Sequence, residues 1–247
     1  MASPVRLYQK EMHDNMGFYA TWLPGDRIEV GDAGVLEAGR FRKMATLREL
    51  GVDVAVEEAG APQNVQYTAT KGVRVESSAG AAVATVGKAE VSIEFAASGA
   101  FVFHATGLQQ WSIRDRVALE ERVRSLAESG QWRDEWLLVE AVHAATRATV
   151  IVSEDSAAGL VIDASADVPI PGVSLADPRV SLSVKSTHGR LVQVIGGEGL
   201  HPLYSCVRLR RHLFGGSSLD PVRGAEAVER HAAAAFVRPG IAELLDS

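Results

Sequence analysis

The chain has 247 residues, of which 47% are hydrophobic and 23% charged, a composition typical of globular rather than disordered proteins. It carries 25 Lys and Arg residues against 31 Asp and Glu residues, a formal net charge of −6. Because neutralising phosphates needs an excess of cations, we expect no nucleic-acid partner. The single cysteine, Cys206, excludes an internal disulfide and fits a reducing compartment.

Neither an export signal nor a membrane-spanning helix is predicted. The first residues lack the long apolar run of a signal peptide. The longest uncharged stretch, residues 95–113, contains Ser, Gly, His and Gln residues and is too polar for a spanning helix. We therefore expect a protein that is cytoplasmic at rest.

Apolar residues alternate with polar ones over much of the chain, and this period of two predicts β-strands. The segments are residues 64–76, 91–95, 101–103, 136–142, 148–153, 160–164, 180–184, 191–195 and 204–209. Turn-forming residues separate them, and the glycine-rich residues 196–199 predict a tight turn between the last two strands.

Helices are fewer. Residues 115–129 predict the clearest one, with a stripe of apolar side chains and Gly130 as its C-terminal stop; the stripe is Val117, Val123, Leu126 and Ala127. A second helix is predicted over residues 225–237, before Pro239. A short helix before Asn15 and one helical turn at residues 47–50 complete the set.

This order of elements predicts an α+β fold: a central twisted, mostly antiparallel β-sheet with flanking helices and a short C-terminal helical tail. The glycine- and serine-containing stretch 215–224 reads as a linker. It would separate a body, residues 1–214, from a tail, residues 225–247.

No constellation of catalytic or metal-binding residues stands out. There is no nucleophile-elbow motif and no closely spaced pair of histidines of the kind that binds zinc. His104 and His143 lie in apolar segments and are expected to be structural, and Cys206 is expected to be a small core residue. We predict neither an enzyme nor a cofactor or metal site.

Two features of the sequence are compatible with contact with a membrane. Small residues fill the alternating segment 77–89, as in a transmembrane β-strand, although an ordinary sheet solvated on one face gives the same alternation. Arg208, Arg210 and Arg211 form a basic cluster that suits either surface ion pairs or contact with anionic lipid.

The order of several motifs is similar to that of one family. A glycine–aromatic opening, residues 17–24, ends in Leu-Pro, and a long strand pair, residues 89–103, ends in Phe101-Val102-Phe103 before a helix. Residues 136–142 resemble a characteristic apolar strand, and residues 199–204 resemble a closing Gly-x-x-Pro-Leu turn. Over residues 17–214 the chain resembles the bacterial gasdermins, which are pore-forming proteins held inactive by a C-terminal segment. The lipidated N-terminal cysteine typical of that family has no counterpart here.

The resemblance implies a monomer that is autoinhibited by its tail. A co-encoded protease would cut at Arg223, Arg211 or Arg230, and the body would form a homo-oligomeric ring in the lipid of the inner membrane, causing cell death in antiphage defence. The residues implied to hold the tail on the body are Val228, Ala232, Phe236, Ile241 and Leu244. Residues 65–103 and 139–194 would each supply a hairpin of two spanning strands, since each exceeds the roughly 20 residues needed.

Two other classes remain open from the sequence. The main alternative is a soluble β-rich module that binds a ligand or a partner protein and has no membrane activity. An enzyme of an unrecognised type is the third.

Overall fold

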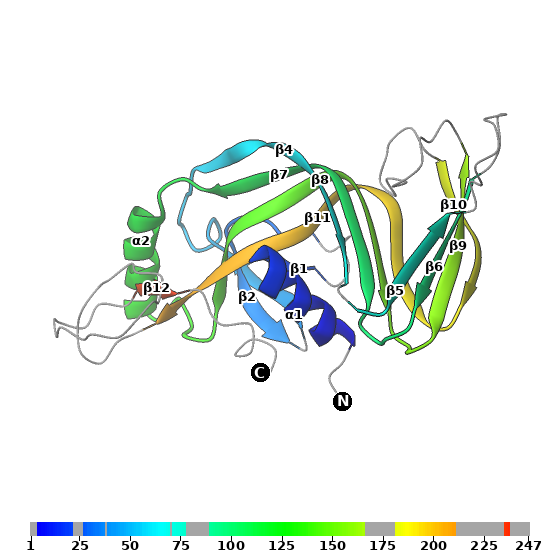
Figure 1. Ribbon diagram of the computed structural model, residues 1–247. Helices are drawn as coiled ribbons and strands as arrows, with labels where there is room; N and C mark the ends of the chain where they lie inside the picture. Colours follow the sequence, from blue (N-terminus) through cyan, green and yellow to red (C-terminus); the bar gives the residue numbers. More distant parts are fainter. Residues whose placement is uncertain are drawn as a thin grey trace, which may run out of the picture. The chain divides into compact units, whose positions relative to one another are not determined.

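The computed structural model describes residues 4–21, 27–37, 39–69, 71–77, 89–165, 181–210 and 235–237. Two helices and twelve strands follow one another along this part of the chain (Figure 1). In order, they are α1 Pro4–Met16, β1 Tyr19–Ala20, β2 Asp32–Glu37, β3 Arg40–Thr46, β4 Val56–Thr68, β5 Val73–Ser77, β6 Ala89–Phe95, β7 Phe101–Ile113, α2 Arg116–Glu128, β8 Leu137–Ser153, β9 Ala158–Ser165, β10 Ser181–His188, β11 Leu191–Arg210 and β12 Ala235–Val237.

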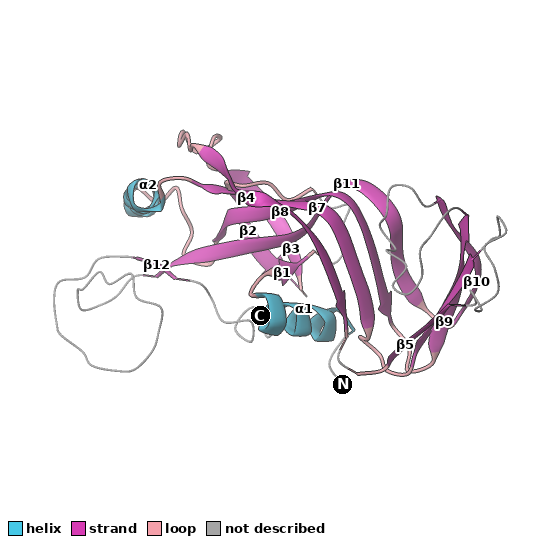
Figure 2. Ribbon diagram, turned by 45° about the horizontal axis from the view of Figure 1, so that its top comes forward, coloured by secondary structure: helices cyan, strands magenta, loops and turns pink. Residues whose placement is uncertain are grey.

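The strands form two sheets (Figure 2). The large sheet has eight strands, with β1, β11, β8, β2 and β3 in that order, while β7 pairs with both β8 and β4, and β12 pairs with β11. The small sheet has four strands in the order β10, β9, β6, β5, and all its pairings are antiparallel. The expectation of an α+β chain dominated by antiparallel sheet is therefore confirmed.

The chain divides into two compact units, each with its own hydrophobic core. Unit 1 holds residues 1–27, 59–110 and 143–203, and unit 2 holds residues 28–58, 111–142 and 204–247. Strands β4, β7, β8 and β11 contribute residues to both units. The core of unit 1 includes Tyr8, Ile93, Phe101, Leu160 and Ile162, and that of unit 2 includes Leu47, Val123, Trp132, Leu138 and Val207.

Helix α2 begins and ends where the sequence predicts. The carboxylate of Asp115 caps its N-terminus by accepting a hydrogen bond from Ala118 N at 2.9 Å, and Gly130 follows its C-terminus with φ 74°. Val123, Leu126 and Ala127 are buried as expected, but Val117 is exposed. The predicted stripe was thus wrong at its first position, because Leu119 turns inward instead.

Two expected breaks do not occur. Strand β8 runs without interruption from Leu137 to Ser153, and β11 runs from Leu191 to Arg210. The tight turn predicted at residues 196–199 was therefore wrong. Gly199 has φ 61°, as at a bulge inside a strand, and a Cβ on Gly197 would come within 2.9 Å of the side chains of Leu200 and Val194. Gly197 therefore serves close packing, and Gly199 provides a positive φ inside the strand, rather than chain reversal.

Residues 47–50 form the expected single turn, in which Leu50 N donates to Thr46 O at 3.1 Å, the spacing of an α-helical hydrogen bond. Two other local features differ from expectation. The β2–β3 hairpin was not predicted at all. The helix predicted over residues 225–237 lies outside the described residues except for its last three, and these form β12, an extended strand paired with β11. Pairing with a neighbouring backbone outweighs the helical preference of an alanine-rich segment.

Helix α1 is part of the core of unit 1. It confirms the short helix expected before Asn15, begins at Pro4, a favoured first residue of helices, and ends at Met16, after which Gly17 N donates to His13 O at 2.8 Å. Tyr8 and Met12 are fully buried, and the Tyr8 ring packs edge-on against Phe101 at a centroid distance of 4.7 Å. Neither α1 nor α2, the helices of the described ranges, is long and apolar enough to cross a membrane.

Candidate functional site

The small sheet has one apolar face and one polar face. Its register places Ile93 opposite both Val75 and Leu160, and Val91 opposite Ile162, so these side chains share a face. Val184 on β10 joins this face opposite Ile162. The apolar face is made up of Val73, Val75, Val91, Ile93, Phe95, Ala158, Leu160, Ile162 and Val184.

The apolar face is buried at its centre and exposed at its two outer strands. Ile93, Leu160 and Ile162 are at most 1% exposed, whereas Val75 on β5 is 51% exposed and Val184 on β10 is 41% exposed. One valine on each outer strand is thus exposed to solvent on the apolar side of the sheet. Part of the apolar face of the small sheet is therefore not covered by other residues of unit 1.

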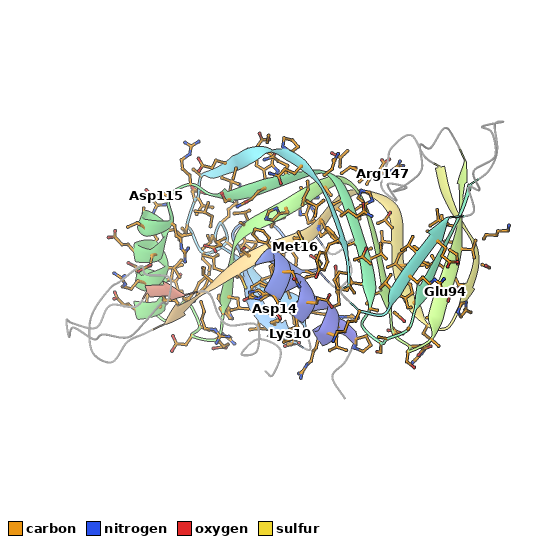
Figure 3. All side chains as sticks on the ribbon, viewed as in Figure 1. Lys10, Asp14, Met16, Glu94, Asp115 and Arg147 are labelled. Atoms are coloured by element: carbon orange, nitrogen blue, oxygen red, sulfur yellow. The ribbon has the colours of Figure 1, made fainter. Side chains whose placement is uncertain are left out.

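The opposite face is polar and charged. Arg74 lies opposite Glu94, and Glu76 opposite Ser92, on β5 and β6. Arg74 forms an ion pair with Glu76 at 2.7 Å. Figure 3 labels Glu94, which stands on β6 within this sheet. The sheet is thus amphipathic, with the period of two that the sequence predicts on β5 and β6, whereas on β10 a register shift between Val184 and Ser186 interrupts the alternation.

A glycine on β9 lets two charged side chains on the polar face meet. Gly159 lies opposite both Glu94 and His188, and a Cβ at this position would approach each of them at 2.6 Å. His188 Nε2 lies 3.3 Å from Glu94 Oε2 and pairs with it as a cation when protonated. This contact joins β6 to β10 across the strand between them.

Four short connections join the small sheet to long strands of the large sheet. They are residues 69–72 between β4 and β5, residues 96–100 between β6 and β7, residues 154–157 between β8 and β9, and residues 189–190 between β10 and β11. Gly72, Gly99 and Gly189 have positive φ in three of them, so the chain bends there. We call these four connections the bend.

Hydrogen bonds tie the connections of the bend to one another. Ala96 N donates to Gly72 O at 2.7 Å, and Ser98 Oγ donates to Glu154 O at 3.1 Å. Glu154 N donates to Arg190 O at 3.0 Å. Each connection therefore contacts its neighbour, and the bend is held as one structure within unit 1.

An ion pair closes the bend on the β10–β11 side. The Arg190 guanidinium donates to Asp155 Oδ1 from Nε at 3.1 Å and from Nη2 at 2.9 Å, and Arg190 N donates to Oδ2 at 2.8 Å. The Arg190 side chain, and next its backbone N–H, hold the pKa of Asp155 below its usual range. The pair therefore stays charged on both sides at neutral pH.

Two open grooves lie beside the bend. One of about 370 Å³ is lined by residues that include Gly72, Phe95, Ser156 and His188. Another of about 330 Å³ lies between α1 and residues 97–100, with Lys10 and Asp14 at its rim (Figure 3). Both have mixed polar and apolar linings, and both belong to unit 1.

The residues predicted from the basic cluster and the tail are described only in part. Arg208 is half-buried on β11, and its backbone lies opposite Val237. Arg210 lies opposite Ala235, and Phe236 lies opposite Leu209. The remaining predicted residues, namely Arg211, Arg223, Arg230, Val228, Ala232, Ile241 and Leu244, lie outside the described residues, as does the linker.

The histidines and the cysteine behave as expected. His104, His143 and Cys206 are all buried. The His143 ring packs edge-on against Phe18 at 4.1 Å, and burial lowers its pKa to about 4. Within the described ranges, no three His, Cys, Asp or Glu side chains are grouped as metal ligands.

The candidate site was only partly accessible to sequence reasoning. The alternation on β5, β6, β9 and β10 was predicted, and turns were expected at residues 154–156 and 188–189. The joining of the four connections into one bend and the Asp155–Arg190 pair were not predicted. Gly99 and Gly189, each close to a predicted strand end, were the available signal. Gly72 lies inside the predicted segment 64–76, and the interruption of that segment between β4 and β5 was not foreseen.

Comparisons with known proteins give little further identification. No protein-family model matches the chain, and no curated protein matches it. Among solved structures, it is similar to a cryo-EM structure of the gasdermin A3 membrane pore, with a TM-score of 0.26 and 11% sequence identity, over 84% of this chain and 90% of that chain. A similarity at this level does not by itself establish a shared fold.

Proposed function

We propose that this chain forms membrane pores, with the two hairpins of the small sheet as the segments that enter the lipid. The observation that carries the proposal is the amphipathic small sheet, whose apolar face continues onto two exposed outer strands. In a pore this face would contact lipid and the charged face would line the water-filled opening, which is the pattern of membrane-spanning strands.

Strand pairing would satisfy the backbone in the membrane. Every N–H and C=O group in the hydrocarbon region needs a partner, and antiparallel hairpins provide one for each group between neighbouring strands. The outer strands β5 and β10 would pair with strands of neighbouring copies. A closed ring of copies follows from this requirement, since any unpaired edge in lipid is costly.

The hairpins are long enough, although their present strands are short. Strands β5, β6, β9 and β10 contain 5, 7, 8 and 8 residues, whereas a spanning strand needs about 9–11. The complete hairpins, residues 73–95 and 158–188, each exceed the roughly 20 residues of two spanning strands. Insertion would therefore lengthen the strands within hairpins that already exist.

The control of pore formation is part of the proposal. In the resting monomer, the tail, residues 225–247, would restrain the body, with β12 on the edge of β11 as one contact. A co-encoded protease would cut at Arg223, Arg211 or Arg230, and the freed tail would lose the high effective concentration that its tether provides. The body would then leave the cytoplasm for the inner membrane, where the basic cluster Arg208, Arg210 and Arg211 contacts anionic lipid and permeabilisation kills the cell as a defence against phage.

Dye leakage tests the proposal. The full chain would be purified with a site-specific protease sequence within residues 217–224 and then cut in the presence of dye-filled liposomes containing anionic lipid. We expect leakage from the cut protein and none from the uncut protein. If both are inert, with the engineered cut and with a co-encoded protease, the chain does not form pores.

A matched pair of variants on β10 tests which segment inserts. Val184 and Ser186 are both exposed at rest, but they lie on opposite faces of the small sheet, since Val184 faces Ile162 and Ser186 faces Val161. A lysine at the middle of the lipid face costs about 2–4 kcal/mol and is tolerated in the lumen. We expect Val184→Lys to reduce leakage at least about tenfold and Ser186→Lys to leave it nearly unchanged. Equal leakage from both variants would exclude the small sheet as the inserted part.

The two grooves favour one alternative, a β-rich module that binds a small ligand or a partner and has no membrane activity. Their volumes of about 330 and 370 Å³ fall at the lower end of ligand pockets. Such a module would remain inert in the leakage test. Neither proposal involves enzymatic activity.

A further inference from the structure

The central strands of the two sheets are in register across the bend. In the small sheet, Phe95 on β6 lies opposite Ala158 on β9. Beyond the bend, Ser153 N on β8 donates to Ala100 O, next to the start of β7, at 2.8 Å. Residues 96–99 and residues 154–157 separate these two pairs, so the two chains have the same number of residues between them. Gly99 N also donates to Ser153 O at 2.7 Å, so Gly99 and Ala100 both lie opposite Ser153, as in a bulge with a positive-φ glycine. From Ala100 onward the alignment set by Phe95 and Ala158 resumes.

The register continues along the long strands. Thr106 Oγ1 on β7 donates to Arg147 O on β8 at 3.4 Å, and a Cβ on Gly107 would come within 2.4 Å of Thr146 Oγ1. Both contacts keep the alignment set by Phe95 and Ala158. Strand β6 therefore pairs with β9, and β7 with β8, in one alignment that extends from Ala89 to at least Gly107.

The apolar face is also continuous across the bend. Ile93 and Phe95 on β6 are buried, and so are Phe101 and Phe103 on β7, all at odd-numbered positions. On the opposing chain, the buried apolar residues at even-numbered positions are Ala148, Val150, Val152, Ala158, Leu160 and Ile162. Beyond the bend the second face is buried as well, since Val102 and Ile151 are at most 1% exposed, so the alignment there rests on the hydrogen bonds and close contacts rather than on burial.

The outer strands do not share this alignment. Between the pair Gly72–Ala96 and the pair Ala69–Phe101, β4–β5 passes two intervening residues and β6–β7 passes four. On the other side, one residue, Gly189, separates His188 from Arg190, while residues 155–158 separate Glu154 from Gly159. Each outer connection therefore contains fewer residues than the connection it pairs with. Of these pairs, the central one, β6–β7 with β9–β8, has the same number of residues on both chains across the bend.

We infer that β6–β7 and β9–β8 form a preassembled two-stranded ribbon that straightens at the bend and keeps its present register in the membrane. This inference rests on the proposed function. Straightening breaks contacts of the bend, such as Ser98–Glu154, and the packing of α1 against Phe101. It breaks none of the ladder pairs, whose loss and re-formation would be the slow and costly route.

Disulfide formation inside the membrane tests the register. Ser92 and Val161 lie directly opposite on the polar face of β6 and β9, so a cysteine at each position is within the range of a disulfide. Thr106 and Arg147 provide a second pair on the other side of the bend. Both would be made in a Cys206→Ser background of the full chain with the engineered cut site. The oxidant would be added only after liposome leakage is complete.

A cross-link within the β5–β6 hairpin provides the control. Glu76 and Ser92 lie opposite each other and stay paired in any insertion of that hairpin, so Glu76→Cys with Ser92→Cys reports whether the oxidant reaches the inserted segment. Disulfide-linked peptides would be identified by mass spectrometry, and monomeric and dimeric products would be separated by electrophoresis.

We expect the pairs Ser92–Val161 and Thr106–Arg147 to form disulfides within one chain as completely as the control pair does. If the control forms and either test pair does not, or if the test pairs link two chains, the strands have re-paired and the inference is wrong. A cut parent chain that never causes leakage contradicts the proposed function, and the inference falls with it. Leakage without the test cross-links contradicts the inference alone.

Discussion

At the scale of single residues, His143 is a buried base that stays neutral in the folded protein. Burial lowers its pKa to about 4, against about 6.5 in an unfolded chain. Between these two values the unfolded chain binds a proton that the folded chain does not. The free energy of unfolding therefore falls as the pH is lowered from 6.5 toward 4, and the contribution of His143 is fully present only above that window.

The first prediction concerns this histidine. Between pH 7.5 and pH 5 we expect the wild-type chain to lose about 2 kcal/mol more unfolding free energy than His143→Phe, which keeps the ring and removes the titrating group. Urea unfolding at several pH values measures the difference. Parallel pH dependence of the two proteins would show that His143 does not remain neutral when buried.

Some residues could be placed from sequence alone and others could not. His143 and Cys206 were expected to be buried because their neighbours in the chain are apolar, and both are. The contact of Asp155 with Arg190 could not be foreseen, because it joins two turns that only the completed sheets bring together. Local pattern predicts burial well, whereas contacts between distant turns depend on topology.

At the scale of elements, α2 illustrates both the strength and the limit of periodicity. Asp115 and Gly130 mark its ends in the sequence, and the structure confirms both. The predicted buried stripe was misplaced by half a turn at Val117. In the first turn of this short helix, packing against the rest of unit 2 determines which side chain is buried, rather than the apolar pattern of the helix itself. Helix α2 packs on the core of unit 2 through Leu119, Val123 and Leu126.

Two valines of α2 give a matched test. Val123 is fully buried, and Val117 is 58% exposed on the same helix. Val123→Ala removes buried methyl groups and leaves a cavity, so we expect a loss of about 2 kcal/mol in unfolding free energy. For Val117→Ala we expect a change within about 0.5 kcal/mol. Urea denaturation compares the two, and equal losses would contradict the inward face assigned here.

The long strands β8 and β11 exceed what alternation alone predicts. Each was read as two strands, because small and polar residues interrupt the apolar pattern at residues 143–147 and 196–199. In the structure the ladder continues through these positions, because pairing needs only backbone groups and small side chains pack closely between neighbours. The small sheet was easier to foresee, since the alternation is uninterrupted on β5, β6 and β9 and is interrupted only between Val184 and Ser186 on β10.

At the scale of the whole molecule, the chain passes repeatedly between its two units. Residues 137–142 of β8 belong to unit 2 and residues 143–153 to unit 1, and β11 is divided in the same way at residues 203 and 204. No sequence pattern marks these crossings, since each falls inside a strand. The expected division into body, linker and tail remains a prediction, because the linker and nearly all of the tail lie outside the described residues.

Shared strands predict how the molecule unfolds. Each unit has a core of its own, but neither can lose its core without disrupting β8 and β11, which hold hydrogen-bonded ladders in both. We therefore expect one cooperative transition rather than two. Leu160→Ala, in the core of unit 1 and 1% exposed, should lower the unfolding free energy by about 2–4 kcal/mol.

Tryptophan fluorescence can show whether a substitution in unit 1 also destabilises unit 2. Of the four tryptophans, Trp111, Trp132 and Trp136 belong to unit 2 and Trp22 belongs to unit 1. In a Trp22→Phe background fluorescence therefore reports on unit 2, while far-ultraviolet circular dichroism reports on all strands. We expect Leu160→Ala to shift the urea midpoints of both signals equally, although the substitution lies in unit 1. If fluorescence keeps the wild-type midpoint while circular dichroism shifts, the units unfold independently, and the strands they share do not couple them.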